Sequence, residues 1–271
     1  MQGSSRPSLA SAEERLETLL GAPDTDRMAV GDALFAVAAL LDRNVSLRRA
    51  LTDPSQEASA KAGLATRLLE GRIPGGVVDL VAGLARSRWS QARDLADALE
   101  QLAVIAIVAA AESAGRLDRV EDELFRFGRT AQGSPGLRAA LGDRSASTQR
   151  KAQLVEQLLA EKVAPETLRL ARQAVVEPRG LNLEHALTRY GQLAAHRREQ
   201  VVAHVIVALP LEQAHRERLT DALQRMYGRR VHLNVDVDPE VLGGIRVEIG
   251  DEVLDGTVGR RLDDARRRLA G

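Results

Sequence analysis

The sequence predicts a mainly α-helical protein: two tandem helical bundles that share one long helix, followed by a small α+β C-terminal domain. Apolar residues recur at helical spacing through most of the first 198 residues. The pattern of residues 30–69 returns at residues 120–159. Beyond residue 199 apolar and polar residues alternate, which is typical of half-buried strands. We therefore expect domains over residues 1–96 (copy one), 97–198 (copy two) and 199–271.

Copy one is expected to be helical throughout. Leu9, Leu16 and Leu19 give residues 7–20 one apolar helical face. Further helices are expected over residues 30–41, 47–51, 57–69 and 74–86. A long helix over residues 91–114 would close copy one and open copy two.

Copy two repeats copy one at a constant offset of 90 residues. Leu34-Phe35, for example, returns as Leu124-Phe125. Between residues 30 and 69, 15 of 40 positions are identical without a gap, which is too many for composition alone. We read a duplicated bundle, whose register drifts by a residue or two after Glu70. Its later helices are expected over residues 147–162, 165–176 and 181–198.

The C-terminal domain has the expected order strand-helix-strand-strand-strand-helix. The strands are predicted over residues 200–209, 231–237, 245–249 and 252–255, with a helix over residues 211–227. Thr257 is a suitable N-cap for the last helix. The helix over 211–227 is expected to turn these residues inward: Leu211, His215, Leu219, Ala222, Leu223 and Met226.

Composition excludes several classes of function. The 38 basic and 38 acidic residues balance, and the densest basic cluster, residues 260–268, has no aromatic stacking platform, so no nucleic-acid partner is expected. The absence of cysteine excludes disulfides and zinc-thiolate sites. The longest apolar run, residues 102–111, is too short for direct membrane insertion. The five histidines lack metal-ligand spacing and no phosphate loop occurs, so we expect no catalytic residue, metal or cofactor.

An ordered motif runs through residues 237–257 of the C-terminal domain. Its marked residues are Pro239, Leu242, Gly243, Gly244, Ile245, Gly250, Asp255 and Gly256. This motif resembles the C-terminal signature of the delta subunit of F-type ATP synthase, whose mitochondrial counterpart is the oligomycin sensitivity-conferring protein. Residues 111–124 also resemble the start of a bacterial delta subunit. The resemblance implies that residues 98–271 cover an ordinary subunit and that copy one is additional.

The resemblance implies a non-catalytic peripheral-stalk (stator) subunit, peripheral to the cytoplasmic side of the cell membrane. Its partners would be the alpha/beta catalytic head, through N-terminal segments of the alpha subunit, and the C-terminal end of the b-type stalk subunit. Such a link would resist rotor torque and so couple proton translocation to ATP synthesis. The runner-up interpretation is a helical-repeat adaptor unrelated to the synthase; an enzyme comes third.

Two apolar stripes are candidates for the contact with the alpha subunit. One contains Leu102, Ile105, Ala106 and Ala109 of the shared helix, and the other contains Leu168, Ala171 and Val175. In the family these two helices form a groove for an amphipathic segment, and such a groove needs apolar anchors at helical spacing. The competing interpretation is that both stripes fill the core of the bundle.

Overall fold

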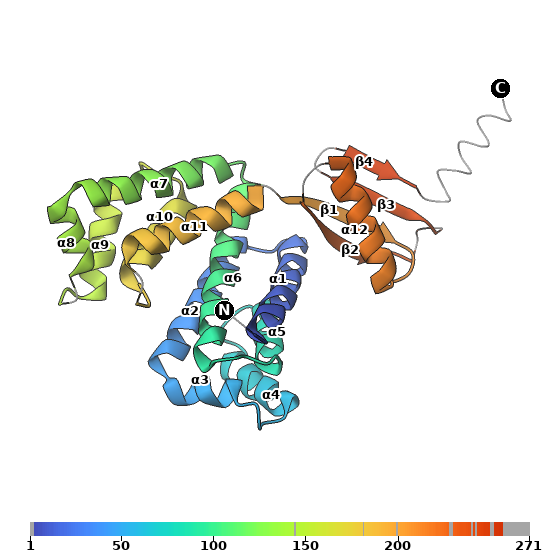
Figure 1. The fold of residues 1–271 in the computed structure, drawn as a ribbon, viewed down its shortest axis with the longest axis horizontal. Helices are drawn as coiled ribbons and strands as arrows, with labels where there is room; N and C mark the ends of the chain where they lie inside the picture. Colours follow the sequence, from blue (N-terminus) through green and yellow to red (C-terminus); the bar gives the residue numbers. More distant parts are fainter. Residues whose placement is uncertain are drawn as a thin grey trace. The chain divides into compact units, whose positions relative to one another are not determined.

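The computed structural model describes residues 3–143, 145–180, 182–198, 200–227, 230–239, 241, 243–249 and 252–256. Its contacts divide the chain into two compact units, Met1–Arg197 and Arg198–Gly271. The first unit is built from helices, and the second contains a sheet and a helix (Figure 1).

The helices of the first unit match the expected ranges closely. They are α1 (Ser5–Gly21), α2 (Arg27–Arg43), α3 (Val45–Thr52), α4 (Ala58–Leu69), α5 (Gly75–Arg86), α6 (Ala92–Ser113), α7 (Leu117–Gly133), α8 (Pro135–Gly142), α9 (Thr148–Leu159), α10 (Pro165–Val176) and α11 (Leu183–Arg198). α1 begins two residues earlier than expected because the buried Ser5 hydroxyl donates to Asp94 (2.6 Å) and accepts from the Ser90 N–H (2.8 Å).

The helices repeat at a constant offset of 90 residues. The first and last residues of α2, α3, α4 and α5 each return 90 positions later as those of α7, α8, α9 and α10. The drift in sequence register expected after Glu70 does not extend to the boundaries of the helices. What shifts is the proline: Pro74 precedes α5, whereas Pro165 is the first residue of α10.

A turn between helices repeats as well. Asp53 Oδ1 accepts hydrogen bonds from the Ser55 N–H and hydroxyl at 2.9 and 2.7 Å. Asp143 Oδ1 accepts the same two bonds from Ser145 at 2.8 and 2.7 Å. These bonds hold the pKa of both aspartates below its usual value.

The long helix α6 runs through the first unit from the group α1–α5 to the group α7–α11 (Figure 1). It contacts α1, α2 and α3 of copy one and α7 and α10 of copy two. Its buried residues are Leu95, Ala96, Ala98, Leu99, Glu100, Leu102, Ala103, Val104, Ala106, Ile107, Val108, Ala109 and Ala111. One hydrophobic core therefore continues through both copies, from Ala12 to Ala194.

The second unit contains a four-stranded sheet in the order β2-β1-β3-β4. Its elements are β1 (Gln200–Val207), α12 (Gln213–Tyr227), β2 (Arg230–Val237), β3 (Ile245–Ile249) and β4 (Glu252–Asp255). β1 and β2 are parallel and joined through α12, while β1–β3 and β3–β4 are antiparallel. The expected last helix from Thr257 lies outside the described residues.

A small separate core holds the second unit together. Ala203, Val205 and Val207 of β1 are buried with Leu223 of α12, and Leu219 packs against them. The prediction that His215, Ala222 and Met226 face inward was wrong, because α12 meets the sheet along the Leu219–Leu223 line and these three side chains are exposed.

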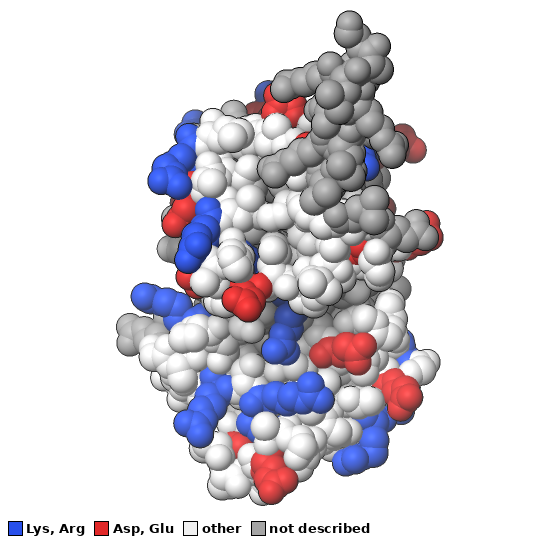
Figure 2. All heavy atoms as spheres, turned by 90° about the vertical axis from the view of Figure 1, so that its right-hand side faces the viewer, with Lys and Arg blue, Asp and Glu red and all other residues white. Residues whose placement is uncertain are grey.

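Within the described part of the chain, no helix combines the length and apolarity needed to cross a bilayer. Figure 2 shows basic and acidic side chains interspersed over the face it displays. This mixture agrees with the balanced charge of the sequence.

Candidate functional site

The candidate groove lies where α10 packs against α6 and α7. Glu123 of α7 fixes the start of α10, because its Oε2 accepts from the Ala164 N–H (2.8 Å) and the Thr167 hydroxyl (2.6 Å). Although burial alone would raise the pKa of Glu123, these bonds and one from Arg119 lower it. Arg116 pairs with the buried Glu166 in the first turn of α10 through two bonds of 2.5 and 3.2 Å.

The seven predicted interface residues divide into two groups. Five of them are buried in the core: Leu102, Ala106, Ala109, Ala171 and Val175. Ile105 and Leu168 are partly exposed and pack against that core. Both predicted stripes therefore contribute to the core, while Ile105 and Leu168 leave apolar surface on α6 and α10.

In the equivalent pair of copy one, two glycines of α5 face side chains of α1. A Cβ at Gly76 or Gly83 of α5 would collide with the side chains of Leu19 or Arg15 of α1. At the equivalent positions of α10, copy two carries the buried Glu166 and Gln173. The two copies thus differ at the surface that the resemblance marks as a binding groove, a difference that helical periodicity alone did not reveal.

Arg179, in the loop between α10 and α11, forms ion pairs with copy one and with α6. Its guanidinium lies 2.7 Å from Asp42 of α2 and 2.7 Å from Asp97 of α6, and its side chain is 6% exposed. It also donates to the carbonyl of Ala96 at 2.6 Å. Glu100 of α6 lies 3.6 Å away and accepts from the Tyr190 hydroxyl at 3.0 Å. Burial and the Glu100 charge raise the pKa of Tyr190 well above its usual value.

Arg197 of α11 makes a second connection between the copies. It binds Glu17 of α1 through bonds of 2.5 and 3.0 Å and Glu112 of α6 at 2.5 Å. Burial would lower the pKa of Arg197, but the two carboxylates raise it. Sequence reasoning missed both connections, because they join residues more than 80 positions apart.

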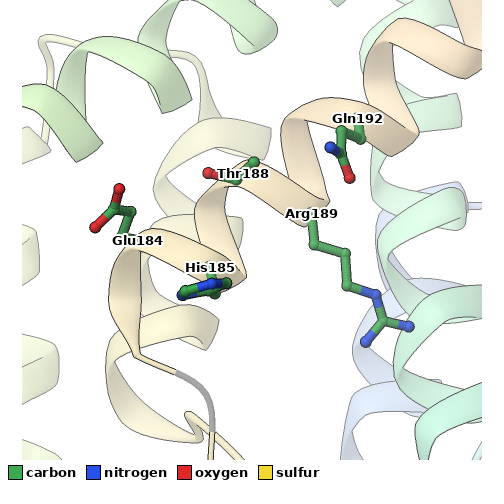
Figure 3. A pocket seen from close by; sticks show the side chains of 5 residues that line it. All are labelled: Glu184, His185, Thr188, Arg189 and Gln192. Carbon is green, nitrogen blue, oxygen red and sulfur yellow. The ribbon is translucent and has the colours of Figure 1, made fainter.

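A shallow hollow of about 470 Å³ runs along α11. Figure 3 shows its five lining side chains, Glu184, His185, Thr188, Arg189 and Gln192, with Arg189 directed toward α6. The ring of His185 bonds to Asn182 at 2.8 Å within its own helix start. None of these groups pairs a nucleophile with a base. Among the described residues, no cluster of His, Cys, Asp or Glu could hold a metal ion.

The C-terminal signature contributes β3 and β4 to the sheet of the second unit. Gly243 and Gly244 have φ of 81° and 90°, a region that favours glycine, and they lead into β3 at Ile245. Gly256 ends β4, after Asp255, and its N–H donates to the Ile245 carbonyl at 2.9 Å. A Cβ at Gly256 would lie 3.2 Å from that oxygen. Pro239 follows β2, while Leu242 and Gly250 lie outside the described residues.

Comparison with known proteins identifies the family. The family model "ATP synthase delta (OSCP) subunit" matches residues 104–269, beginning within α6. The ATP synthase subunit delta of Streptomyces coelicolor is 55% identical over 270 residues, covering 100% of this chain and 98% of the relative. That of Thermobifida fusca is 47% identical over 271 residues, covering all of both chains. A chain of the Toxoplasma gondii mitochondrial ATP synthase hexamer aligns with a TM-score of 0.29 at 20% identity, covering 62% of this chain and 95% of that chain.

The relatives align over both copies and the second unit, so the additional helices before residue 104 are shared with them. An adaptor unrelated to the synthase is not favoured by these matches. The chain belongs to the ATP synthase delta (OSCP) subunit family, and it is a non-catalytic component of the peripheral stalk.

Proposed function

We propose that this chain links N-terminal segments of the alpha subunit to the C-terminal end of the b-type stalk subunit. Copy two would bind the alpha segment on the α6–α10 surface around Ile105 and Leu168. The second unit would hold the b-type subunit. The complex would place the chain on the cytoplasmic side of the membrane, peripheral to the bilayer.

The difference between the two helix pairs supports copy two as the binding copy. In copy one, the side chains of Leu19 and Arg15 of α1 occupy the space beside Gly76 and Gly83 of α5. In copy two, Ile105 and Leu168 are partly exposed on α6 and α10. An amphipathic helix binds through apolar anchors of this kind.

The mechanism is mechanical. The catalytic head must be held against the torque of the rotor, or proton flow is not coupled to ATP synthesis. A link under load must not change shape, and copy one serves this purpose by supporting copy two through Arg179, Arg197 and their carboxylate partners. We infer that copy one stiffens the head-binding bundle.

Co-elution of the full chain with an isolated alpha/beta head tests the proposal. Leu168→Lys places a charge on the α10 surface and should weaken co-elution by tenfold or more, because a lysine cannot replace an apolar anchor. Val45→Lys is the matched control: Val45 is 45% exposed on α3 of copy one. Full-length variants are preferable to fragments, since a cut between residues 96 and 97 would divide α6.

Thermal unfolding must show that Leu168→Lys folds like the unchanged chain. If it does not, a labelled peptide from the N-terminus of the alpha subunit provides the second measurement, with Ile105→Ser as the variant. The proposed surface would be refuted if the unchanged chain binds the head and the peptide and neither Leu168→Lys nor Ile105→Ser weakens this binding. A wild-type chain that binds neither head nor stalk would refute the linking role.

A further inference from the structure

Asp32 and Phe35, about one turn apart on α2, together hold an arginine of copy two. Arg169 of α10 forms an ion pair with Asp32. Its guanidinium carbon lies 4.5 Å from the centroid of the Phe35 ring, which is 3% exposed. A planar guanidinium is suited to this site because it can stack on a ring and pair with a carboxylate at the same time.

The same acid–aromatic pair occurs in copy two without such an arginine. Asp122 and Phe125 of α7 stand 90 positions after Asp32 and Phe35. The Phe125 side chain is 67% exposed. Asp122 pairs with Arg126 of its own helix at 2.9 Å, where both side chains are largely in solvent, at 53% and 75% exposure. In copy one the position of Arg126 is Ala36, so Asp32 has no such neighbour one turn on.

We propose that Asp122 and Phe125 form a docking surface for an arginine-bearing helix of another subunit of ATP synthase. The incoming guanidinium stacks on the Phe125 ring and pairs with Asp122, which releases Arg126 to solvent. The internal repeat supplies the geometry, since copy one already uses this pair to hold α10. The inference rests on the proposed linking role, because it requires a partner chain in the complex.

A second copy of this chain does not fit the surface. Its Arg169 is already held by its own Asp32 and Phe35. Its remaining α10-like helix, α5, carries the exposed Asp79 at the position equivalent to Arg169. Asp79 would bring a like charge against Asp122 and oppose binding. With both α10-like helices of this chain excluded, the occupant that we propose is a helix of a different chain.

Rebinding of the full chain to ATP synthase depleted of this subunit tests the inference. Phe125→Ala should weaken rebinding by about 3- to 30-fold, the range expected for loss of one cation–π contact. Phe125→Leu should weaken it nearly as much, because leucine keeps apolar area but has no aromatic face. Arg126→Ala should leave rebinding unchanged or tighter, because it frees Asp122. Both positions are exposed, so the melting temperature should stay constant.

The outcomes separate this inference from the proposed function. Normal rebinding by Phe125→Ala would overturn the docking surface alone. If Phe125→Ala weakens rebinding but Phe125→Leu rebinds fully, the docking surface for arginine is also overturned, since the occupant would then be apolar. If Arg126→Ala weakens rebinding as much as Phe125→Ala does, then Arg126 itself contacts the partner, and the proposal is overturned too. A wild-type chain that does not rebind would overturn both proposals.

Discussion

At the scale of single residues, buried charges connect the two copies. Arg179 is 6% exposed, and Asp42, Asp97 and Glu100 surround it within 3.6 Å. Removing one partner of a buried ion pair leaves uncompensated charge, which costs more than the pair itself contributes. Arg179 is therefore the residue whose loss should most directly separate copy one from copy two.

Arg179→Met should lower the free energy of unfolding by about 3 kcal/mol, since Asp42, Asp97 and Glu100 would each lose one of their cations. Arg43→Met is the matched control, because Arg43 pairs with Glu177 but is 69% exposed. The control should cost less than about 1 kcal/mol, as exposed pairs do. Urea unfolding of both variants checks this, and equal costs would contradict the role given to Arg179.

Glu123 acts as a cap supplied from another helix. Ala164, the N-cap residue of α10, has no polar side chain, and Glu123 of α7 accepts from the Ala164 N–H and from the Thr167 hydroxyl in the first turn. Glu123→Gln should destabilise the unit by about 1 kcal/mol at neutral pH, through the loss of charge-assisted hydrogen bonds.

We expect the destabilisation caused by Glu123→Gln to depend on pH. The pKa of Glu123 is lowered from its usual 4.5 in the folded chain. Its stabilising effect is therefore complete above about pH 4.5 and is lost as pH falls through the folded-state pKa. The difference in free energy of unfolding between wild type and Glu123→Gln should therefore shrink as the pH falls over that acidic range. Urea titrations at pH 7 and pH 3.5 measure it, and a constant difference would contradict the cap.

At the scale of elements, the close approach of α2 and α6 depends on Gly31. A Cβ at Gly31 would lie 2.5 Å from Ile107 Cδ1 and 3.1 Å from the Ala103 carbonyl oxygen. Glu121 occupies the equivalent position on α7. A small residue thus sets the spacing of the two helices that form the centre of copy one.

Gly31→Ala should destabilise the chain by about 1 kcal/mol or more, although alanine favours helices by nearly 1 kcal/mol over glycine. Gly63→Ala on α4 is the control, because the nearest atom to its added Cβ is the flexible Arg67 Nη1 at 3.4 Å. The control should stabilise the chain slightly. Thermal unfolding that ranks the two variants in the opposite order would contradict the close packing.

Much at this scale could be predicted from periodicity. The boundaries of α4, α5 and α10 follow from apolar spacing and nearby Pro or Gly residues. Periodicity cannot separate a core stripe from a binding stripe, because both are apolar at the same spacing. Ile105 and Leu168 were therefore predicted together with five core residues. The Arg169–Phe35 contact joins residues 134 positions apart, so local pattern could not reveal it.

At the scale of the whole molecule, the two units have separate cores. Leu99 lies in the core of the first unit and Leu233 in that of the second. Leu99→Ala and Leu233→Ala should each cost about 2–5 kcal/mol, in different units. Calorimetry should show two transitions, each lowered by one substitution. A single transition lowered equally by both would contradict the division.

The shared helix also restricts how this chain can change in length. α6 has 22 residues, and each residue inserted into it would turn everything beyond by about 100° and shift it by about 1.5 Å. Such a turn would swing Arg179 and Arg197 away from Asp42 and Glu17, while α6 itself remained a good helix. Insertions should therefore be tolerated in the loops around α6 and excluded from its centre. The number of residues in that one helix sets the rotation of one bundle relative to the other.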